Sequence, residues 1–332
     1  MARQPTLKDV AQIANVSEMT VSRVLRGKGD TTETTRARVL KAAKQIGYVP
    51  NRIAGSLSSQ RVDLVGLIVP SLSNMVFSEV VMGVSKGLEG SVLQPVFGLS
   101  HYDLETEEKV ILEMLSWRPS GLIVAGLEHT PNATRAMAAA DIPIVEIMDT
   151  DGHPTDYNVG ISQIQAGVSM AEAFLSRGYQ NIGFIGSKMP ADFRAQKRLK
   201  GFEDTLAAAG QSLTHAVFHA GGSSLRRGRD MTAALLKDSP EIDGIYYSTD
   251  LLAAGGLLHC LDEGIAVPGD VALAGFNGLD LLDGLPKRIA TTDAGRFASG
   301  FEAAQIVQAA LQGTPIERVL RLDAELDIGD TL

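Results

Sequence analysis

The chain has 332 residues, a formal net charge of −9, 45% hydrophobic residues and one cysteine. This length exceeds what a single compact core usually holds, so two or three domains are expected. No apolar run is long enough to cross a membrane, the first residues lack the apolar core of a secretion signal, and one cysteine cannot form an internal disulfide. Membrane and disulfide-scaffold classes are therefore excluded, and we expect a cytoplasmic protein that does not bind a membrane.

The first stretch with a clear pattern is Thr6–Leu25, which reads TLKDVAQIANVSEMTVSRVL. Its apolar residues from Leu7 to Ala14 follow helical spacing, and Thr6 is a suitable N-terminal cap. Ser17 can cap a second short helix after a tight turn. Two such helices predict a helix-turn-helix, whose second helix normally enters the DNA major groove. Small helical bundles also contain this hairpin, so the next thirty residues must decide between the two interpretations.

Those residues predict a third amphipathic helix over 31–46, closed by Gly47. The sequence GYVPNRIAGSL follows at 47–57. The string DVA-x-x-A-x-VS-x-x-TVSRVL, a third helix and then GY-x-PN-x-x-A-x-x-L resemble the DNA-binding head and hinge of the lactose/purine-repressor (LacI-type) family. The resemblance covers essentially the whole chain. It implies a helix-turn-helix head at 1–49, a hinge helix and linker at 50–61, and an effector-binding and dimerisation domain at 62–332.

Charge is divided unevenly along the chain. Residues 1–60 contain ten Lys and Arg against four Asp and Glu, a balance of +6 that leaves −15 for the rest of the −9 total. A basic module attached to an acidic body is typical of a DNA-binding protein whose body stays away from the phosphates.

The resemblance implies that bases are read by the first two residues of the second helix and by an arginine one turn later. These are Glu18, Met19 and Arg23. Arg23 can form the bidentate contact to guanine, Glu18 can accept from a cytosine amine, and Met19 can contact a thymine methyl. The other expected DNA-binding residues are Thr6, Thr20, Ser22, Asn51, Arg52, Ala54 and Leu57. Thr20, Ser22 and Asn51 are placed for phosphates. Leu57 matches the leucine that in this family wedges into the minor groove.

The rest of the chain alternates short apolar runs with amphipathic stretches. The predicted strands are 64–69, 93–97, 121–125, 142–147, 181–186, 215–219, 244–248 and 271–276, with helices at 76–89, 103–117 and 131–140. This alternation predicts an α/β fold with parallel sheets covered by helices. The resemblance implies a periplasmic-binding-protein-like body of two doubly wound parallel-sheet subdomains joined by three crossovers. Its N-subdomain would span about 62–160 and 292–318, and its C-subdomain 161–291 and 319–332.

Ligands of open α/β sheets bind outside the carboxyl ends of the strands. The candidate effector-binding residues are Ser73, Asn74, Phe77, His129, Asp149, Arg194, Arg198, Asp250, Asn277 and Asp293. Taken singly, Asp149 and Asn277 could be turn residues, and the two arginines could be solvated helix charges. As a set at strand ends they predict a polar pocket with an aromatic wall.

The resemblance assigns some roles within this set. Asp149 matches a pocket acid, Arg198 a sugar-contacting arginine, and Asn277 an aspartate of the usual pocket turn. The family usually has two aspartates at this turn, and here Asn277 and Gly278 stand in their place. The basic segment KMPADFRAQKR at 188–198 is expected to lie beside this turn. Less negative charge there suits an anionic effector, which arginine can bind in a bidentate manner.

Within the family, four short motifs of this chain resemble the corresponding motifs of repressors of gluconate utilisation. They are Met-Leu-Ser-Trp at 114–117, His-Thr-Pro at 129–131, Glu-Ile-Met-Asp at 146–149 and Gly-Phe-x-Gly at 275–278. We therefore predict a repressor of sugar-acid catabolism that binds double-stranded operator DNA as a homodimer. Gluconate or a related sugar acid would bind between the two subdomains and release the repressor from a palindromic operator.

Three alternatives remain open. The effector could instead be a neutral sugar, a pentose or a purine, acting as inducer or co-repressor. A sugar-binding transport protein would share the body but has no reason to carry the head. An enzyme is disfavoured, because metal-ligand spacing, phosphate-loop spacing and a GxSxG elbow are all missing from the sequence. We expect no cofactor and no metal.

Overall fold

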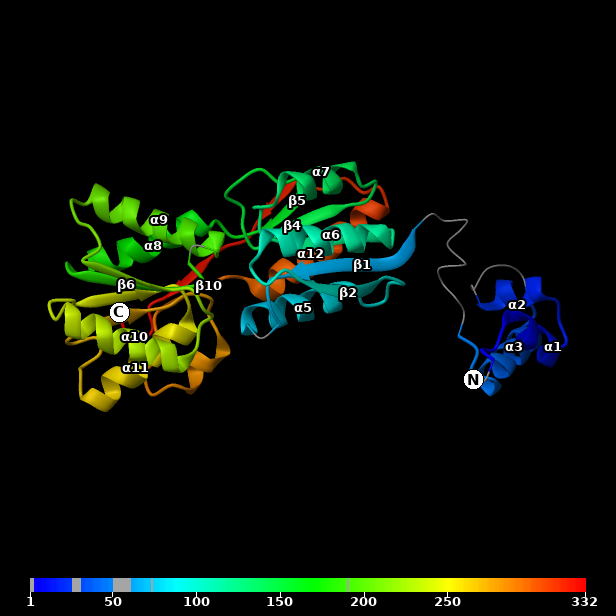
Figure 1. Cartoon of the computed structure of the whole chain (residues 1–332), viewed down its shortest axis with the longest axis horizontal. Helices are drawn as coiled ribbons and strands as arrows, with labels where there is room; N and C mark the ends of the chain where they lie inside the picture. The colour runs from blue at the N-terminus through cyan, green and yellow to red at the C-terminus, as the bar shows by residue number, and fades with distance from the viewer. Residues whose placement is uncertain (1–2, 26–30, 50–60, 73, 190) are drawn as a thin grey trace. The chain divides into compact units, whose positions relative to one another are not determined.

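The computed structural model describes residues 3–25, 31–49, 61–72, 74–189 and 191–332. The chain divides into two compact units, residues 1–62 and 63–332, which we call the head and the body (Figure 1). The predicted hinge at 50–61 lies, apart from residue 61, outside the described residues. No helix in the described part of the chain is long and apolar enough to cross a membrane.

The head contains three helices, α1 (Leu7–Ala14), α2 (Glu18–Leu25) and α3 (Glu33–Gln45). A reciprocal cap begins α1, because the Asp9 amide donates to Thr6 Oγ1 and the Thr6 amide donates to the Asp9 carboxylate at 2.7 Å. Asn15 ends α1 in a left-handed conformation with φ of 49° and turns the chain toward α2. Val10, Val21 and Val39, one from each helix, are fully buried and form the centre of the head. The predicted helix-turn-helix and third helix are confirmed.

The first half of the body, the N-subdomain, is built on a six-stranded sheet of order β11-β5-β4-β3-β1-β2. Its strands are β1 (Val62–Val69), β2 (Gln94–Leu99), β3 (Pro119–Ala125), β4 (Ile144–Ile147), β5 (Tyr157–Gly160) and β11 (Val319–Arg321). The pairs β1–β2, β3–β4, β4–β5 and β5–β11 are parallel.

Helices cover both faces of this sheet. Helices α5 (Met75–Gly87) and α12 (Arg296–Leu311) pack with Val65, Leu67 and Val69 of β1. Helices α6 (Leu104–Ser116) and α7 (Pro131–Ala139) pack with Ile68 of β1 on the other face. Alternate residues of β1 therefore serve two cores, which explains its nearly continuous apolar sequence.

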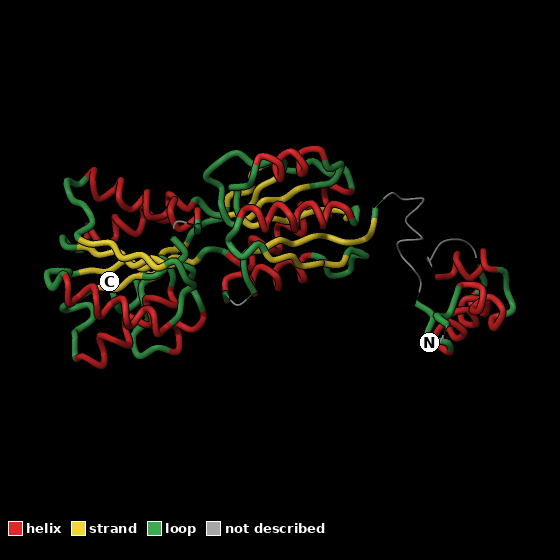
Figure 2. The backbone as a smooth tube through the Cα atoms, viewed as in Figure 1, coloured by secondary structure: helices red, strands yellow, loops and turns green. Residues whose placement is uncertain are grey.

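The other half, the C-subdomain, has a parallel four-stranded sheet of order β7-β6-β8-β9. Its strands are β6 (Ile182–Ser187), β7 (His215–His219), β8 (Gly244–Tyr247) and β9 (Ala272–Ala274). Helices α8 (Gln163–Ser176) and α9 (Phe193–Ala208) cover one face, and α10 (Leu225–Asp238) and α11 (Asp250–Glu263) cover the other, as Figure 2 shows. The 3₁₀ helix η2 (Asp280–Gly284) follows β9.

Three passages of the chain join the two halves, at β5–α8, β10–α12 and β11–β12. Strands β10 (Thr291–Asp293) and β12 (Glu325–Asp327) pair antiparallel beside two of these passages. The second N-subdomain segment, predicted to end at about residue 318, is followed directly by β11 at 319–321, which pairs with β5 of the six-stranded sheet.

The eight predicted strands and three predicted helices of the body all appear, most of them with shifted ends. The last predicted strand, 271–276, shortens to Ala272–Ala274. Four further strands, β5, β10, β11 and β12, were not predicted. Each has only three or four residues. Strands this short, interrupted by polar side chains, carry no periodic signal of their own.

Candidate DNA-binding surface and effector cleft

The second helix of the head presents three of the predicted base-reading side chains to solvent. Glu18, Met19 and Arg23 are exposed, while Val21 and Val24 are buried. Met19 is 64% exposed, so its side chain is accessible to a partner. This face has the composition expected of a recognition helix.

Some of the polar residues near this face form hydrogen bonds within the head. Ser17 begins α2, where its Oγ accepts from the Thr20 amide at 3.2 Å and lies 2.9 Å from Thr20 Oγ1. The Thr6 hydroxyl donates to the Asp9 carboxylate at 2.7 Å, so its described role is to cap α1. Ser22 is half-buried. The predicted DNA-binding residues Asn51, Arg52, Ala54 and Leu57 lie outside the described residues.

A cavity of about 380 Å³ lies between the strand ends of the two subdomains. Its N-subdomain wall consists of Pro70, Ser71, Asn74, Met75, His101 and Tyr102. Its C-subdomain wall consists of Ser187, Lys188, Asp192, Gly222, Ser223, Thr249, Leu251, Asn277 and Leu279. This volume lies in the usual range for small-molecule sites, and the position follows the strand-end rule. We call this cavity the cleft.

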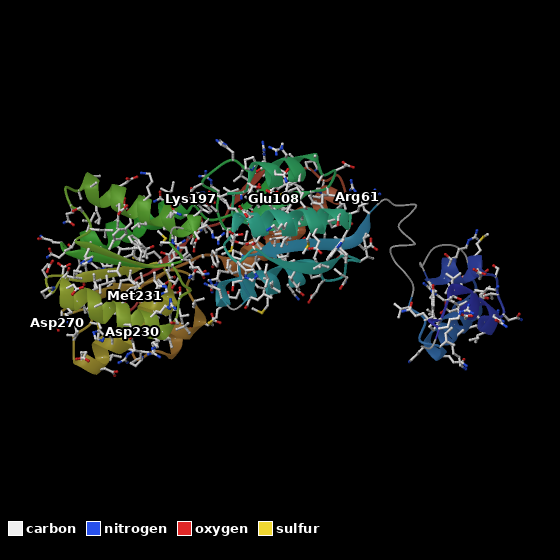
Figure 3. All side chains as sticks on the ribbon, viewed as in Figure 1. Arg61, Glu108, Lys197, Asp230, Met231 and Asp270 are labelled. Carbon is white, nitrogen blue, oxygen red and sulfur yellow. The ribbon has the colours of Figure 1, made fainter. Side chains whose placement is uncertain are left out.

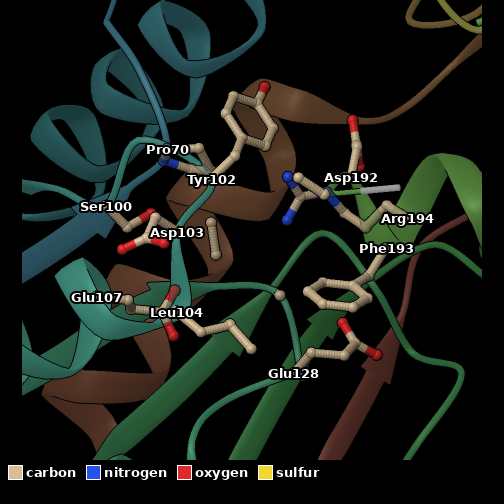
Figure 4. A pocket seen from close by; sticks show the side chains of 13 residues that line it. Pro70, Ser100, Tyr102, Asp103, Leu104, Glu107, Glu128, Asp192, Phe193 and Arg194 are labelled. Carbon is tan, nitrogen blue, oxygen red and sulfur yellow. The ribbon is translucent and has the colours of Figure 1, made fainter. Parts of the chain in front are cut away.

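A second cavity of about 30 Å³ adjoins the cleft and shares Pro70, Tyr102 and Asp192 with it. Figure 4 shows Arg194 directed into this small cavity, with Tyr102 and Asp192 on one side and Glu128 on the other. The guanidinium of Arg194 also lies over the Phe77 ring, 5.7 Å from its centre. Burial opposes the charge of Arg194, but neighbouring anions, chiefly Asp192, raise its pKa further, so it stays cationic.

Tyr102 is the central aromatic residue of the cleft, and the sequence analysis did not identify it. Its hydroxyl accepts from Asn74 Nδ2 at 3.2 Å, and its ring meets Phe77 edge-on at 6.4 Å between centres. Burial raises the pKa of Tyr102 to about 12, so the phenol is neutral at pH 7. Tyr102 and His101 both have left-handed backbones, with φ of 62° and 56°, a strain that clusters at ligand sites. Its position just after β2 is the signal that could have identified it.

The opposite wall is rich in hydroxyl and amide groups. Ser187 Oγ lies 2.7 Å from Ser223 Oγ, which also accepts from Thr249 Oγ1 at 3.0 Å. Asn277 lines the cleft with φ of 127°, a conformation that asparagine tolerates better than most residues. This wall therefore offers neutral donors and acceptors where the family pattern has an aspartate.

Two cations of the basic segment, Lys197 and Arg198, are not among the residues that line either cavity. Lys197 lies on α9 and is labelled in Figure 3. Its Nζ binds Glu128 at 2.6 Å and Asp149 at 2.5 Å, which ties α9 to the N-subdomain. Burial raises the pKa of the Asp149 carboxyl, and Lys197 opposes that shift. Arg198 donates to Gln163 Oε1 at 2.6 Å and to the Ser248 carbonyl at 3.0 Å, and its guanidinium lies 3.6 Å from the centre of the Phe276 ring.

His129 forms a buried bridge between two glutamates. Its Nδ1 lies 2.5 Å from Glu107 Oε1 and its Nε2 lies 3.1 Å from Glu146 Oε1, and the side chain is only 2% exposed. Burial lowers its pKa, but the two glutamates outweigh burial and raise it to about 9. His129 therefore links α6, the loop after β3 and β4, and both ring nitrogens are occupied.

Asp250 and Asp293 hold the loops that join the subdomains. The buried Asp250 carboxylate accepts from Thr291 Oγ1 at 2.6 Å and from the Leu279 amide at 2.8 Å, and burial raises its pKa to about 6. The Asp293 carboxylate is exposed and accepts from the Gly295 amide at 2.9 Å.

The structure thus divides the ten predicted effector residues. Asn74 and Asn277 line the cleft, Arg194 lines the small cavity, and Phe77 packs behind Tyr102. Besides Phe77, five predicted residues are not among those lining either cavity, namely His129, Asp149, Arg198, Asp250 and Asp293. Each of these five is engaged by protein partners. Ser73 lies outside the described residues.

Comparison with known proteins decides the family. Residues 6–51 match the bacterial regulatory proteins of the lacI family, and residues 62–319 match the periplasmic binding proteins and sugar binding domain of LacI family. The chain belongs to the LacI family. It is a transcription regulator with a helix-turn-helix DNA-binding head and a periplasmic-binding-protein-like α/β body, as predicted.

The relatives cover nearly the whole chain. The HTH-type transcriptional regulator GntR of Pseudomonas aeruginosa is 35% identical over 98% of this chain and 93% of its own. GntR of Escherichia coli K12 is 32% identical over 99% of this chain and 97% of its own. The crystal structure of a LacI family transcriptional regulator from Silicibacter pomeroyi has a TM-score of 0.96 at 54% identity, covering 98% of this chain and 99% of that one.

Proposed function

We propose that this regulator is a homodimeric repressor that works in the cytoplasm. It binds a near-palindromic operator and is released from it by gluconate or a closely related sugar acid. The observation that carries the effector assignment is the make-up of the cleft, which combines hydroxyls, amides and an ammonium in a cavity of about 380 Å³. A linear sugar acid presents several hydroxyls and one carboxylate, and this wall offers partners for both kinds of group.

The neutral side chains suit the hydroxyl groups of such a ligand. Ser187, Ser223 and Thr249 already share hydrogen bonds with one another, so a polyol can join an ordered chain of hydroxyls. Asn277 can donate and accept, whereas an aspartate at this position could only accept and would repel a carboxylate. Relatives named GntR agree with the motif similarity to repressors of gluconate utilisation.

The DNA side of the proposal rests on the exposed face of α2 and the basic head. Arg23 is the side chain we expect to set base preference, with Glu18 and Met19 at the start of the same helix. A homodimer presents two such helices, and a two-fold protein reads a two-fold site.

Contacts between the subdomains provide a route from effector to DNA affinity. Arg296 Nη2 donates to Glu79 of α5 at 2.8 Å and to the Gly278 carbonyl at 3.0 Å, next to the cleft residues Asn277 and Leu279. The start of α5 lines the same cleft. A ligand that binds one arrangement of these walls more tightly than another shifts the balance between arrangements, and can do so only by that difference in affinity.

Two measurements test this function separately. Selection of binding sites from a random duplex library tests the head, and we expect a near-palindrome whose enrichment disappears in Arg23→Ala. Calorimetric titration tests the effector, and we expect gluconate to bind while glucose, ribose, adenine and hypoxanthine do not. Tight binding of a neutral sugar or purine with no gluconate binding would overturn the sugar-acid assignment and leave the regulator assignment standing.

A further inference from the structure

The basic segment 188–198 contains four cationic side chains, which differ in the protein groups that they contact. Lys197 is ion-paired to Glu128 and Asp149, and Arg198 is enclosed by Gln163, Ser248 and Phe276. Arg194 lies over Phe77 beside the anion Asp192 in the small cavity. Lys197 and Arg194 thus lie beside carboxylates of the protein, while Arg198 is buried among neutral groups and is not among the residues that line either cavity.

Lys188 is different because it lines the cleft itself. Among the residues that the structure describes, no carboxylate lies within ion-pairing distance of its ammonium. The ammonium instead lies over the Tyr102 ring, 5.0 Å from its centre. Lys188 comes from the C-subdomain and Tyr102 from the N-subdomain, so this contact spans the cleft.

We propose that Lys188 binds the carboxylate of the effector, and that the Tyr102 ring holds the ammonium in place while the cleft is empty. This inference rests on the proposed function and assigns its acid-recognising group. Lys188 is then the residue that distinguishes a sugar acid from the neutral sugar with the same hydroxyls.

The backbone fixes the starting point of this side chain. Lys188 has a left-handed conformation with φ of 61°, which is uncommon for a residue other than glycine. Its amide donates to the His219 carbonyl at 2.7 Å, and its carbonyl accepts from the Asp192 amide at 2.9 Å. The strained backbone directly after β6 is therefore held from both sides.

The Tyr102 contact is suited to a temporary partner. A cation over an aromatic ring is attracted less strongly than a cation that donates charged hydrogen bonds to a carboxylate. An incoming carboxylate can therefore replace the ring as the partner of the ammonium. The hydroxyls of Ser187, Ser223 and Thr249 belong to the same wall, so the rest of a sugar acid can bind beside Lys188.

Asp192 is the one acid among the cleft-lining residues, and its charge is partly compensated. Its carboxylate caps α9 by accepting from the Ala195 amide at 3.2 Å, at the positive end of a sixteen-residue helix. The nearby Arg194 offsets it further. A carboxylate bound at Lys188 is therefore not opposed by a free negative charge.

The test is calorimetric titration of the full-length protein with D-gluconate, D-glucitol and D-glucose 6-phosphate. Glucitol has the hydroxyls of gluconate without its carboxylate, and glucose 6-phosphate supplies a phosphate as the competing anion. The variants are Lys188→Asn, because asparagine tolerates the left-handed backbone, and Lys188→Arg, which keeps the charge. Lys200→Asn is the matched control, because Lys200 is exposed on α9 and paired only with Asp204.

We expect Lys188→Asn to weaken gluconate binding by about 10- to 150-fold, the range for losing a hydrogen bond to a charged group. Lys188→Arg should retain most of the affinity, Lys200→Asn should match the wild type, and glucitol should not distinguish Lys188→Asn from the wild type. If Lys188→Asn does not fold, Lys188→Gln provides the neutral variant.

The failures of the two proposals are distinguishable. If the wild type binds gluconate and folded Lys188→Asn binds it within threefold, the role of Lys188 is overturned and the proposed function stands. If the wild type binds glucose 6-phosphate or a neutral sugar but not gluconate, the sugar-acid function is overturned and the carboxylate role of Lys188 with it.

Discussion

Replacing His129 by glutamine tests whether this residue stabilises the N-subdomain through its two glutamates. Its imidazolium lies between Glu107 and Glu146, and its pKa rises from 6.5 to about 9 in the folded protein. A rise of about 2.5 pKa units at 1.36 kcal/mol each corresponds to about 3 kcal/mol of stability. Since the folded pKa is the higher one, this stability is complete below pH 6.5 and is lost as the pH rises through 9.

The assay is urea unfolding of the wild type and His129→Gln at several pH values from 6 to 9.5. At pH 6 we expect the variant to lose about 3–5 kcal/mol, because two buried carboxylates lose their cationic partner. The difference between the two proteins should shrink by about 3 kcal/mol toward pH 9.5. His153→Gln is the control, because His153 is exposed. A difference that does not change with pH would show that the imidazolium of His129 does not stabilise the N-subdomain through its two glutamates.

Three further predictions concern the packing of the fold. Gly83→Ala should lower the free energy of unfolding by about 2–3 kcal/mol in urea titrations, because the new Cβ would lie 2.1 Å from the backbone oxygen of Phe297 in α12; Gly284→Ala, which has open space around it, should be neutral. Thr6→Ala removes the cap of α1 and should cost about 1 kcal/mol, seen as amide hydrogen exchange about fivefold faster in that helix. Cys260 is buried and its pKa is raised to about 11, so a thiol reagent at pH 8 should label it only after unfolding; rapid labelling of the native protein would contradict this burial.

The sequence predicts the architecture well because its signals are local. Strand β1 is almost continuously apolar since its residues alternate between two cores, as with Leu67 and Ile68. The α1 cap is likewise specified by two residues three positions apart, Thr6 and Asp9. The antiparallel pair β10–β12 has no such signal, because Thr291 and Asp327 are separated in the sequence by α12 and β11.

The site was harder to predict because residue type does not reveal the partner. Arg198 was expected in the pocket, but Gln163 and Ser248, distant in sequence, hold it against Phe276. Whether a strand-end residue faces the cleft or the interior depends on such long-range contacts. Tyr102 was missed for the same reason, since its role follows from Asn74 and Lys188 across the fold.

We propose that effector binding in the body controls operator binding by the head. The most direct test is fluorescence anisotropy of a labelled operator duplex with the full-length protein at fixed salt, titrated with gluconate. We expect specific binding without effector and progressive release as gluconate is added. Unchanged DNA binding at gluconate concentrations that saturate the cleft, or tighter binding, would contradict it.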